Sequence, residues 1–183
     1  AHLERCGVSV ATVKSEGDLA RVHGLVIPGG ESTTMSILAV KNNLLQPLRA
    51  FRESHPVYGS CAGLIMLADE VIDGRVDQQT IGGLHITAQR NAFGRQVDSF
   101  EIDLDVAALG TPSFPAVFIR APLVTRVGDD VEVLATIPAD ISAKGEEQIV
   151  AVRQGNLLAT SFHPEITPDL RFHQYFAEMV KVA

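Results

Sequence analysis

The chain has 183 residues, a net charge of −7 at pH 7 and 46% hydrophobic residues. This length allows one domain with a substantial core, and we expect residues 1–183 to form a single domain. Nucleic acid is not expected as a partner, because phosphate binding requires clustered Lys and Arg, which the sequence lacks. No apolar run approaches the roughly 18 residues of a membrane span, and no signal segment opens the chain. We therefore expect a cytoplasmic protein that binds neither nucleic acid nor membranes.

The cysteines and histidines predict neither a disulfide framework nor a metal site. There are two cysteines, Cys6 and Cys61, and six histidines. Disulfide frameworks use several pairs in short secreted chains, and no Cys-x-x-Cys or His-Glu-x-x-His spacing occurs. We interpret both cysteines as free thiols and expect no metal and no cofactor.

The N-terminal half alternates strand-like and helix-like segments. The predicted strands are VSVATV (8–13), GLVIP (24–28) and PVYG (56–59). The predicted helices are 32–42, 44–53 and one that begins at Ala62. Strands and helices in alternation are typical of parallel βαβ units.

The C-terminal half contains several short strands and one final helix. The predicted strands lie in 98–105, 116–122, 131–136 and 148–162, the last with a hairpin turn at 154–156. The final helix is predicted from Pro168 to about Val182, with one apolar face. That face comprises Leu170, Phe172, Tyr175, Phe176, Met179 and Val180. Together the two halves indicate an α/β domain with a mixed sheet covered by helices.

The stretch GSCAG places Cys61 between two glycines, where a predicted strand meets a predicted helix. This is the form of a nucleophile elbow, in which the glycines permit a tight turn that lifts the side chain clear of the sheet. The amino end of the helix would favour the thiolate. The alternative is a buried structural cysteine, which is the common role of a lone free cysteine.

The stretch SFHPE offers a base for such a thiol. His163 and Glu165 are two residues apart, so in an extended or kinked segment both side chains project to one side. Pro164 prevents a helix there. The carboxylate would hold the imidazole in one tautomer and stabilise its charged form. The alternative is a solvated turn before the final helix.

The stretch PGGES lies at the carboxyl end of the predicted strand 24–28, where open α/β sheets bind ligands. It is not a phosphate-binding P-loop, because the pattern Gly-x-x-x-x-Gly-Lys-Ser/Thr is missing. Its glycine N–H groups could bind an oxyanion. An ordinary strand-to-helix turn is the alternative.

In this order, PGGES, GSCAG and SFHPE resemble the Cys-His-Glu triad of the class I glutamine amidotransferases. The chain further resembles the glutaminase subunits of pyridoxal 5'-phosphate synthase complexes. The runs that carry this resemblance are IPGGESTTM, YGSCAGLIMLA, QRNAFGRQVDSF, VFIRAP and SFHPE. This similarity covers essentially the whole chain. It implies a three-layer, flavodoxin-like class I glutamine amidotransferase fold, with a mixed, mostly parallel sheet flanked by helices.

The resemblance also implies a reaction, the hydrolysis of L-glutamine to L-glutamate and ammonia through a cysteine thioester. Carried onto this sequence, it makes Cys61 the nucleophile, His163 the base and acid, and Glu165 the residue that orients His163. The oxyanion would be bound by backbone N–H groups of Gly30 and Ala62. The implied glutamine contacts are Gly30, Glu31, Ser32, Arg90, Ile119 and Arg120.

A partner is implied as well, a (β/α)8-barrel pyridoxal 5'-phosphate synthase subunit in a hetero-oligomer that channels the ammonia into vitamin B6 biosynthesis. The resemblance implies that docking rearranges the oxyanion loop, with Gly29-Gly30 as the switch. It implies a hydrolase and, within the complex, also a lyase. The family begins with a strand carrying Leu-Gln-Gly, whereas this chain opens at AHLERCGV, so we expect that first strand to be absent.

Three other functions stay open. The first is a γ-glutamyl hydrolase or cysteine peptidase with a similar elbow, which release of ammonia from free glutamine would exclude. The second is an inactive module that only binds the synthase, against which the intact Cys61, His163 and Glu165 argue. The third is the glutaminase of another amidotransferase, such as imidazole glycerol phosphate synthase. Only the runs RNAFGRQVDSF and VFIRAP distinguish the glutaminase of pyridoxal 5'-phosphate synthase from that third function.

Overall fold

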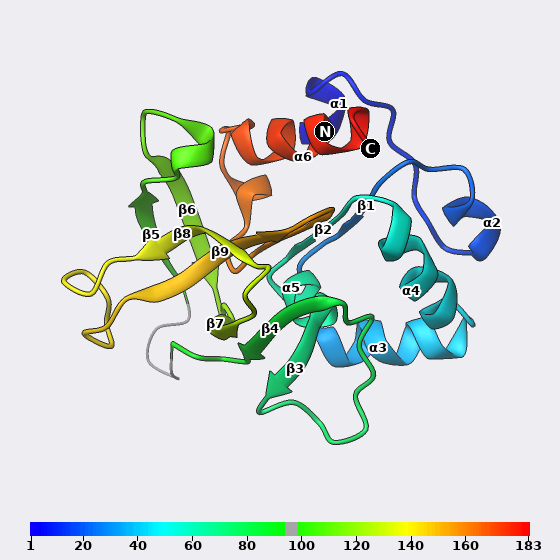
Figure 1. The fold of residues 1–183 in the computed structure, drawn as a ribbon, viewed down its shortest axis with the longest axis horizontal. Coiled ribbons are helices and arrows are strands. Elements are labelled where there is room, and N and C mark those ends of the chain that lie inside the picture. Colours follow the sequence, from blue (N-terminus) through cyan, green and yellow to red (C-terminus); the bar gives the residue numbers. More distant parts are fainter. Residues whose placement is uncertain (94–98) are drawn as a thin grey trace.

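The computed structural model describes residues 1–93 and 99–183 (Figure 1). Its α-helices are α1 (His2–Arg5), α2 (Glu16–Leu19), α3 (Ser32–Lys41), α4 (Leu45–Ser54), α5 (Ala62–Leu67) and α6 (Arg171–Lys181). Two short 3-10 helices are η1 (Ala107–Leu109) and η2 (Pro164–Ile166). The strands are β1 (Leu25–Ile27), β2 (Val57–Ser60), β3 (Ala68–Ile72), β4 (Leu84–Gln89), β5 (Ser99–Leu104), β6 (Phe114–Ile119), β7 (Leu123–Val127), β8 (Glu132–Ile137), β9 (Gln148–Gln154) and β10 (Leu157–Thr160).

Eight strands form a mixed sheet in the order β1-β2-β10-β9-β7-β4-β3, with β8 paired to β9. Strands β5 and β6 form a separate antiparallel pair. Within the described part of the sheet, parallel pairing joins β1 to β2, β2 to β10 and β3 to β4. The remaining pairs are antiparallel, so the parallel share of the sheet is smaller than the sequence indicates.

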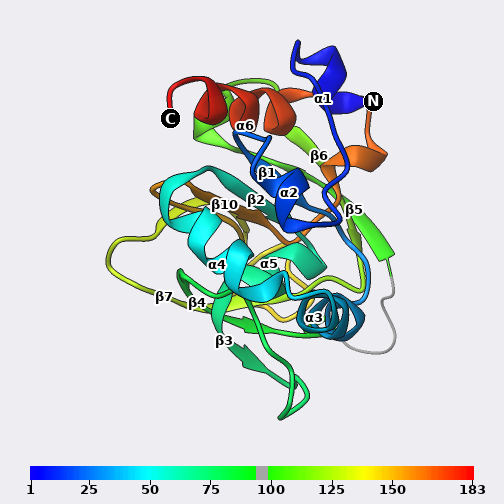
Figure 2. The same ribbon diagram turned by 90° about the vertical axis from the view of Figure 1, so that its right-hand side faces the viewer.

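Helices cover both faces of the β1-β2-β10 region (Figures 1 and 2). Helices α1 and α6 lie on one face, and α3, α4 and α5 lie on the other. Successive strand residues point to opposite faces. Tyr58 and Leu158 accordingly join the core beneath α6, whereas Val57 and Leu157 join the core that contains α5. This arrangement confirms the predicted three-layer α/β fold.

The three parallel strands carry the three motifs to one edge of the sheet. β1, β2 and β10 are neighbours, with Ile27 and Ala159 both opposite Gly59. Because parallel strands end at the same edge, the loops that follow them converge there. These loops contain Gly29-Gly30, Cys61 and His163 respectively. The fold thus brings together segments that are far apart in the sequence.

Two predicted elements differ in the structure. Residues 8–13 form no strand, and with β1 and α6 they line a groove of about 780 Å³. They have β-branched character but no hydrogen-bonded neighbouring strand, and pairing is what makes an extended segment a strand. The final helix begins at Arg171 and not at Pro168, and the Asp169 carboxylate, which precedes the N-cap Leu170, accepts a hydrogen bond from the Arg171 N–H (3.0 Å).

Other predictions of elements are confirmed. Helix α3 begins at Ser32, and β9 and β10 form the predicted hairpin around Gly155, where φ is +53°. Both cysteines are free thiols. Among the described residues no helix is long and apolar enough to cross a membrane. Residues 94–98, which belong to the motif RNAFGRQVDSF, lie outside the described residues.

Candidate active site

Cys61 sits in a strained turn between β2 and α5. Its backbone has φ +51° and ψ −105°, a conformation that side chains rarely adopt. A Cβ at Gly63 would overlap the Ile27 carbonyl, and a Cβ at Gly59 would overlap the backbone of Gly63. Only glycine fits these two positions. The tight strand-to-helix turn predicted at Cys61 is therefore present, and its strain is a consequence of how closely α5 packs on β1 and β2.

His163 and Glu165 lie in the segment that follows β10. The His163 backbone N–H donates to the Val117 carbonyl at 2.8 Å, which anchors this segment to β6. The His163 Nδ1–H donates to Glu165 Oε1 at 2.7 Å. Gly29 packs against the imidazole, since a Cβ at that position would overlap the ring. The predicted His-x-Glu geometry is present, and the loop after β1 forms one wall of it.

The electrostatics of this pair favour a charged imidazole. Hydrogen bonding with Cys61 and then with Glu165 raises the pKa of His163 to about 10, against the opposing effect of burial. Burial acts to raise the pKa of Glu165, but the hydrogen bond from His163 and nearby positive charge leave that pKa below its usual value. At neutral pH the histidine is therefore an imidazolium held between the Cys61 sulfur and the Glu165 carboxylate.

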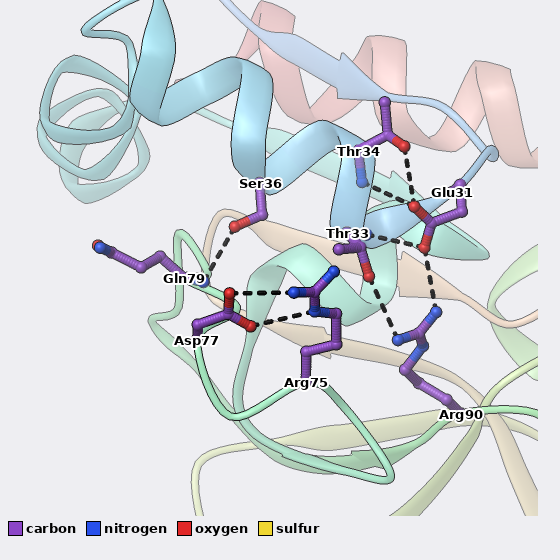
Figure 3. Close-up of polar contacts among 8 residues, drawn as sticks. All are labelled: Glu31, Thr33, Thr34, Ser36, Arg75, Asp77, Gln79 and Arg90. Atoms are coloured by element: carbon purple, nitrogen blue, oxygen red, sulfur yellow. Dashed lines mark hydrogen bonds and ion pairs between the residues drawn. The ribbon is translucent and has the colours of Figure 1, made fainter.

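Glu31, at the end of the loop after β1, forms an ion pair with Arg90 (Figure 3). Arg90 Nη2 donates to Glu31 Oε1 at 3.1 Å. Glu31 is also the N-cap of α3, because its carboxylate accepts the N–H groups of Thr33 (2.9 Å) and Thr34 (2.7 Å). These contacts, with the Thr33 N–H the largest cause, lower the pKa of Glu31 to about 2. The carboxylate is thus ionised throughout the physiological range.

The other predicted glutamine contacts are Ser32, which begins α3, and Ile119 and Arg120, at and just after the end of β6. Ser32 is 2% exposed, and no protein group among the described residues hydrogen-bonds its buried Oγ. The Ile119 carbonyl lies 3.9 Å from Cys61 Sγ. Arg120 follows Ile119, with φ +45°. Ile119 therefore borders the thiol, and the Ser32 hydroxyl is left without a protein hydrogen-bond partner among the described residues.

The two predicted oxyanion donors follow neighbouring strands, Gly30 in the loop between β1 and α3 and Ala62 at the start of α5 after β2. Gly30 has φ +149°, which favours glycine, and a Cβ there would press on the Met35 side chain. Ala62 is the first residue of α5, where N–H groups have no acceptor within the helix.

In the described part of the chain, no group of three or more His, Cys, Asp or Glu side chains is placed to hold a metal ion.

Two threonines that were not among the predicted site residues contact this region. The Thr34 hydroxyl donates to Glu31 Oε2 at 2.9 Å, and Thr33 Oγ1 accepts from Arg90 Nη1 at 3.4 Å. The sequence signal is the run Glu-Ser-Thr-Thr at a helix start, where side-chain oxygens commonly bond the first turn. The pairing of Thr33 with Arg90 has no such local signal, since Arg90 is 57 positions away.

A strained cysteine turn, an adjoining imidazolium–carboxylate pair and a three-layer α/β fold are the arrangement expected of a cysteine-dependent amidohydrolase. A sequence model of the SNO glutamine amidotransferase family matches residues 1–182. The chain therefore belongs to the SNO glutamine amidotransferase family, and it is a glutaminase.

Named relatives agree with this assignment. The chain is 56% identical over 184 residues to the pyridoxal 5'-phosphate synthase subunit PdxT of Nocardia farcinica (strain IFM 10152), covering 100% of this chain and 80% of that protein. It is 54% identical to the protein of that name from Salinispora arenicola (strain CNS-205), covering 100% and 90%. A solved structure described as a glutamine amidotransferase has a TM-score of 0.88 at 44% identity, covering 98% of this chain and 90% of that one.

These similarities favour the glutaminase of pyridoxal 5'-phosphate synthase over the alternatives, namely a γ-glutamyl hydrolase or the glutaminase of another amidotransferase. One expectation is wrong. The chain is not a lyase, because the matching family is that of a glutamine amidotransferase, and release of ammonia from glutamine by water is a hydrolase reaction.

The elbow geometry predicts that Gly63→Ala destabilises the fold. The added Cβ has no room beside the Ile27 carbonyl, so we expect a loss of roughly 1–3 kcal/mol in the free energy of unfolding. Urea denaturation would measure it. The matched control is Gly17→Ala in α2, where the nearest atom to the new Cβ is Ser15 Oγ at 3.8 Å. Equal stability of the two variants would contradict the steric explanation.

The hydrogen bonding of His163 predicts an unusual titration. We expect its imidazole to titrate near pH 10 instead of near 6.5, and Cys61→Ala to lower that pKa, because hydrogen bonding with Cys61 is its largest cause. NMR titration of the imidazole signals, assigned with His163→Asn, would measure both values. Since the folded-state pKa is raised, the associated stabilisation is complete below pH 6.5 and is lost as the pH rises through 10. An unchanged pKa in Cys61→Ala would refute the contact.

Proposed function

We propose that this chain hydrolyses L-glutamine at Cys61, with His163 and Glu165 as its catalytic partners. The ammonia serves a synthase subunit in the biosynthesis of pyridoxal 5'-phosphate, as the names of its relatives indicate. The observation that carries the proposal is the strained elbow at Cys61 beside a histidine whose ring is hydrogen-bonded to Glu165 at 2.7 Å. A structural cysteine would need neither the strain nor the pair.

The proposed reaction has two halves. The Cys61 thiolate attacks the side-chain carboxamide carbon of glutamine, and the His163 imidazolium then gives its proton to the departing nitrogen, which leaves as ammonia. The remaining thioester is attacked by water, from which His163 takes a proton, and glutamate is released with the thiolate restored. Glu165 keeps Nδ1–H engaged, so that Nε2 faces the reacting atoms.

The oxyanion of each tetrahedral intermediate would be bound by the backbone N–H groups of Gly30 and Ala62. We assign the switch to Gly29-Gly30. Gly30, with φ +149°, can change its peptide orientation without a side-chain clash, whereas Gly29 packs against the imidazole of His163. Docking of the synthase would therefore set the oxyanion donor and the general base together.

Glutamine would be held at its amino-acid end by opposite charges. The Glu31 carboxylate suits the α-ammonium group, and the Arg90 and Arg120 guanidinium groups suit the α-carboxylate. The buried Ser32 hydroxyl, which has no protein partner among the described residues, would bond the substrate. The Ile119 carbonyl near Sγ would border the side-chain carboxamide.

The partner in this proposal is a (β/α)8-barrel synthase subunit, joined with this glutaminase in a hetero-oligomer through which ammonia passes without release to solvent. Residues 1–183 would act as one glutaminase domain. A cytoplasmic location also remains a prediction, as does operation without a cofactor.

The first experiment is an assay of glutamate production from L-glutamine by the chain alone and with a pyridoxal 5'-phosphate synthase subunit added. We expect strong activation by the synthase and no turnover by Cys61→Ala in either condition. Cys61→Ala should keep its fold, because a small side chain fits the buried elbow. Turnover by Cys61→Ala would refute the nucleophile, and fast turnover that is unaffected by the synthase would refute the switch.

The role of Glu165 predicts a separate result. Glu165→Gln should lower kcat in the complex by roughly 10²- to 10⁴-fold, the range for positioned acid–base groups. Glu178→Gln is a matched control, since Glu178 is an exposed α6 residue whose ion pair is with Lys181. Near-normal turnover by Glu165→Gln would mean that Glu165 does not act on His163.

A further inference from the structure

We infer that Thr34 is a positioning residue that fixes the Glu31 carboxylate for glutamine binding, and that Thr33 does the same for Arg90. This inference rests on the proposed glutaminase function and concerns the same site. Neither threonine belongs to the glutamine contacts assigned above. Each contributes a side-chain hydroxyl to one member of the Glu31–Arg90 pair (Figure 3).

The two oxygens of Glu31 have different partners. Oε2 accepts both hydrogen bonds of Thr34, from the backbone N–H at 2.7 Å and from the hydroxyl at 2.9 Å. Oε1 accepts the Thr33 N–H at 2.9 Å and Arg90 Nη2 at 3.1 Å. The Thr34 hydroxyl is thus the one side-chain donor to Oε2 among the described contacts. It adds a restraint that the helix backbone does not supply.

This restraint matters because the Glu31 side chain is 53% exposed. An exposed glutamate samples many rotamers, and ordering it when substrate binds costs conformational entropy. A hydroxyl that holds the carboxylate before glutamine arrives removes part of that cost, which is the physical basis of preorganisation. The expected signature is a change in substrate binding, with the chemical step at Cys61 unaffected.

The second hydroxyl extends the arrangement to Arg90. Thr33 Oγ1 accepts from Nη1 while Glu31 accepts from Nη2, so both terminal nitrogens of the guanidinium are engaged on α3. The first turn of α3 therefore sets the position of one negative and one positive group. A free α-amino acid carries the complementary pair of charges, and the fixed spacing would select it over ligands that lack either charge.

The test uses Thr34→Val, which keeps the β-branched shape and removes the hydroxyl, assayed in the complex with the synthase subunit. We expect KM for L-glutamine to rise roughly 3- to 10-fold, the range for the net loss of one typical hydrogen bond, with kcat unchanged. Thr34→Ser, which retains the donor, should restore KM. In a Glu31→Ala background, Thr34→Val should change KM no further, because Thr34 acts through Glu31.

The matched control is Thr136→Val on β8, where the lost hydroxyl also donates to a glutamate, Glu147, at 3.4 Å. It should leave KM unchanged. The inference is overturned if Thr34→Val lowers the melting temperature with KM unchanged, as a purely helix-capping role would require. It is also overturned if the Thr34→Val effect persists in full without Glu31. If the wild-type complex hydrolyses no glutamine, the proposed function itself fails, which is a different result.

Discussion

The close approach of α5 to β1 and β2 is the constraint on which the rest of the structure depends. Neither Gly59 nor Gly63 has room for a Cβ, because each faces backbone of the neighbouring segment. The chain must then turn sharply at Cys61, in a conformation with φ +51° that the surroundings hold in place. All six residues of α5 are buried, so the packing that stabilises the core also fixes the direction of the thiol.

The polar part of the site depends on that frame. The loops after β1, β2 and β10 meet because these strands are parallel neighbours, and this puts Gly29 against the His163 ring. An imidazolium between the Cys61 sulfur and a carboxylate suits the proposed attack by a thiolate, followed by protonation of a leaving amine. The Glu31–Arg90 ion pair joins the residue before α3 to the residue after β4. It thereby brings a charged side chain from the β4 side of the sheet next to the loop after β1.

Sequence patterns predicted the elements that have clear boundaries. β1 and β2 are short apolar runs bordered by glycine or proline, and the β9–β10 hairpin has its turn at Gly155. β3 was not predicted, because Leu67 ends α5 and Ala68 begins β3 with no turn residue between them. β4 and β7 were missed too, since neither run is set off by a hairpin turn. Residues 8–13 show the opposite case, a β-branched run without a pairing partner.

The sequence by itself determined the local geometry of the candidate site, since Gly-x-Cys-x-Gly after a strand specifies a tight turn at a cysteine, and His-x-Glu after another strand places a carboxylate beside an imidazole. It also determined the glycines, whose need follows from tight turns. Only the tertiary structure decided which side chains meet. The Glu31–Arg90 pair, the packing of Gly29 on His163 and the hydroxyls of Thr33 and Thr34 depend on strand order and helix placement. Except for the Thr34 hydroxyl, which bonds Glu31 three residues away, these contacts join residues far apart in the chain, and no local pattern encodes them.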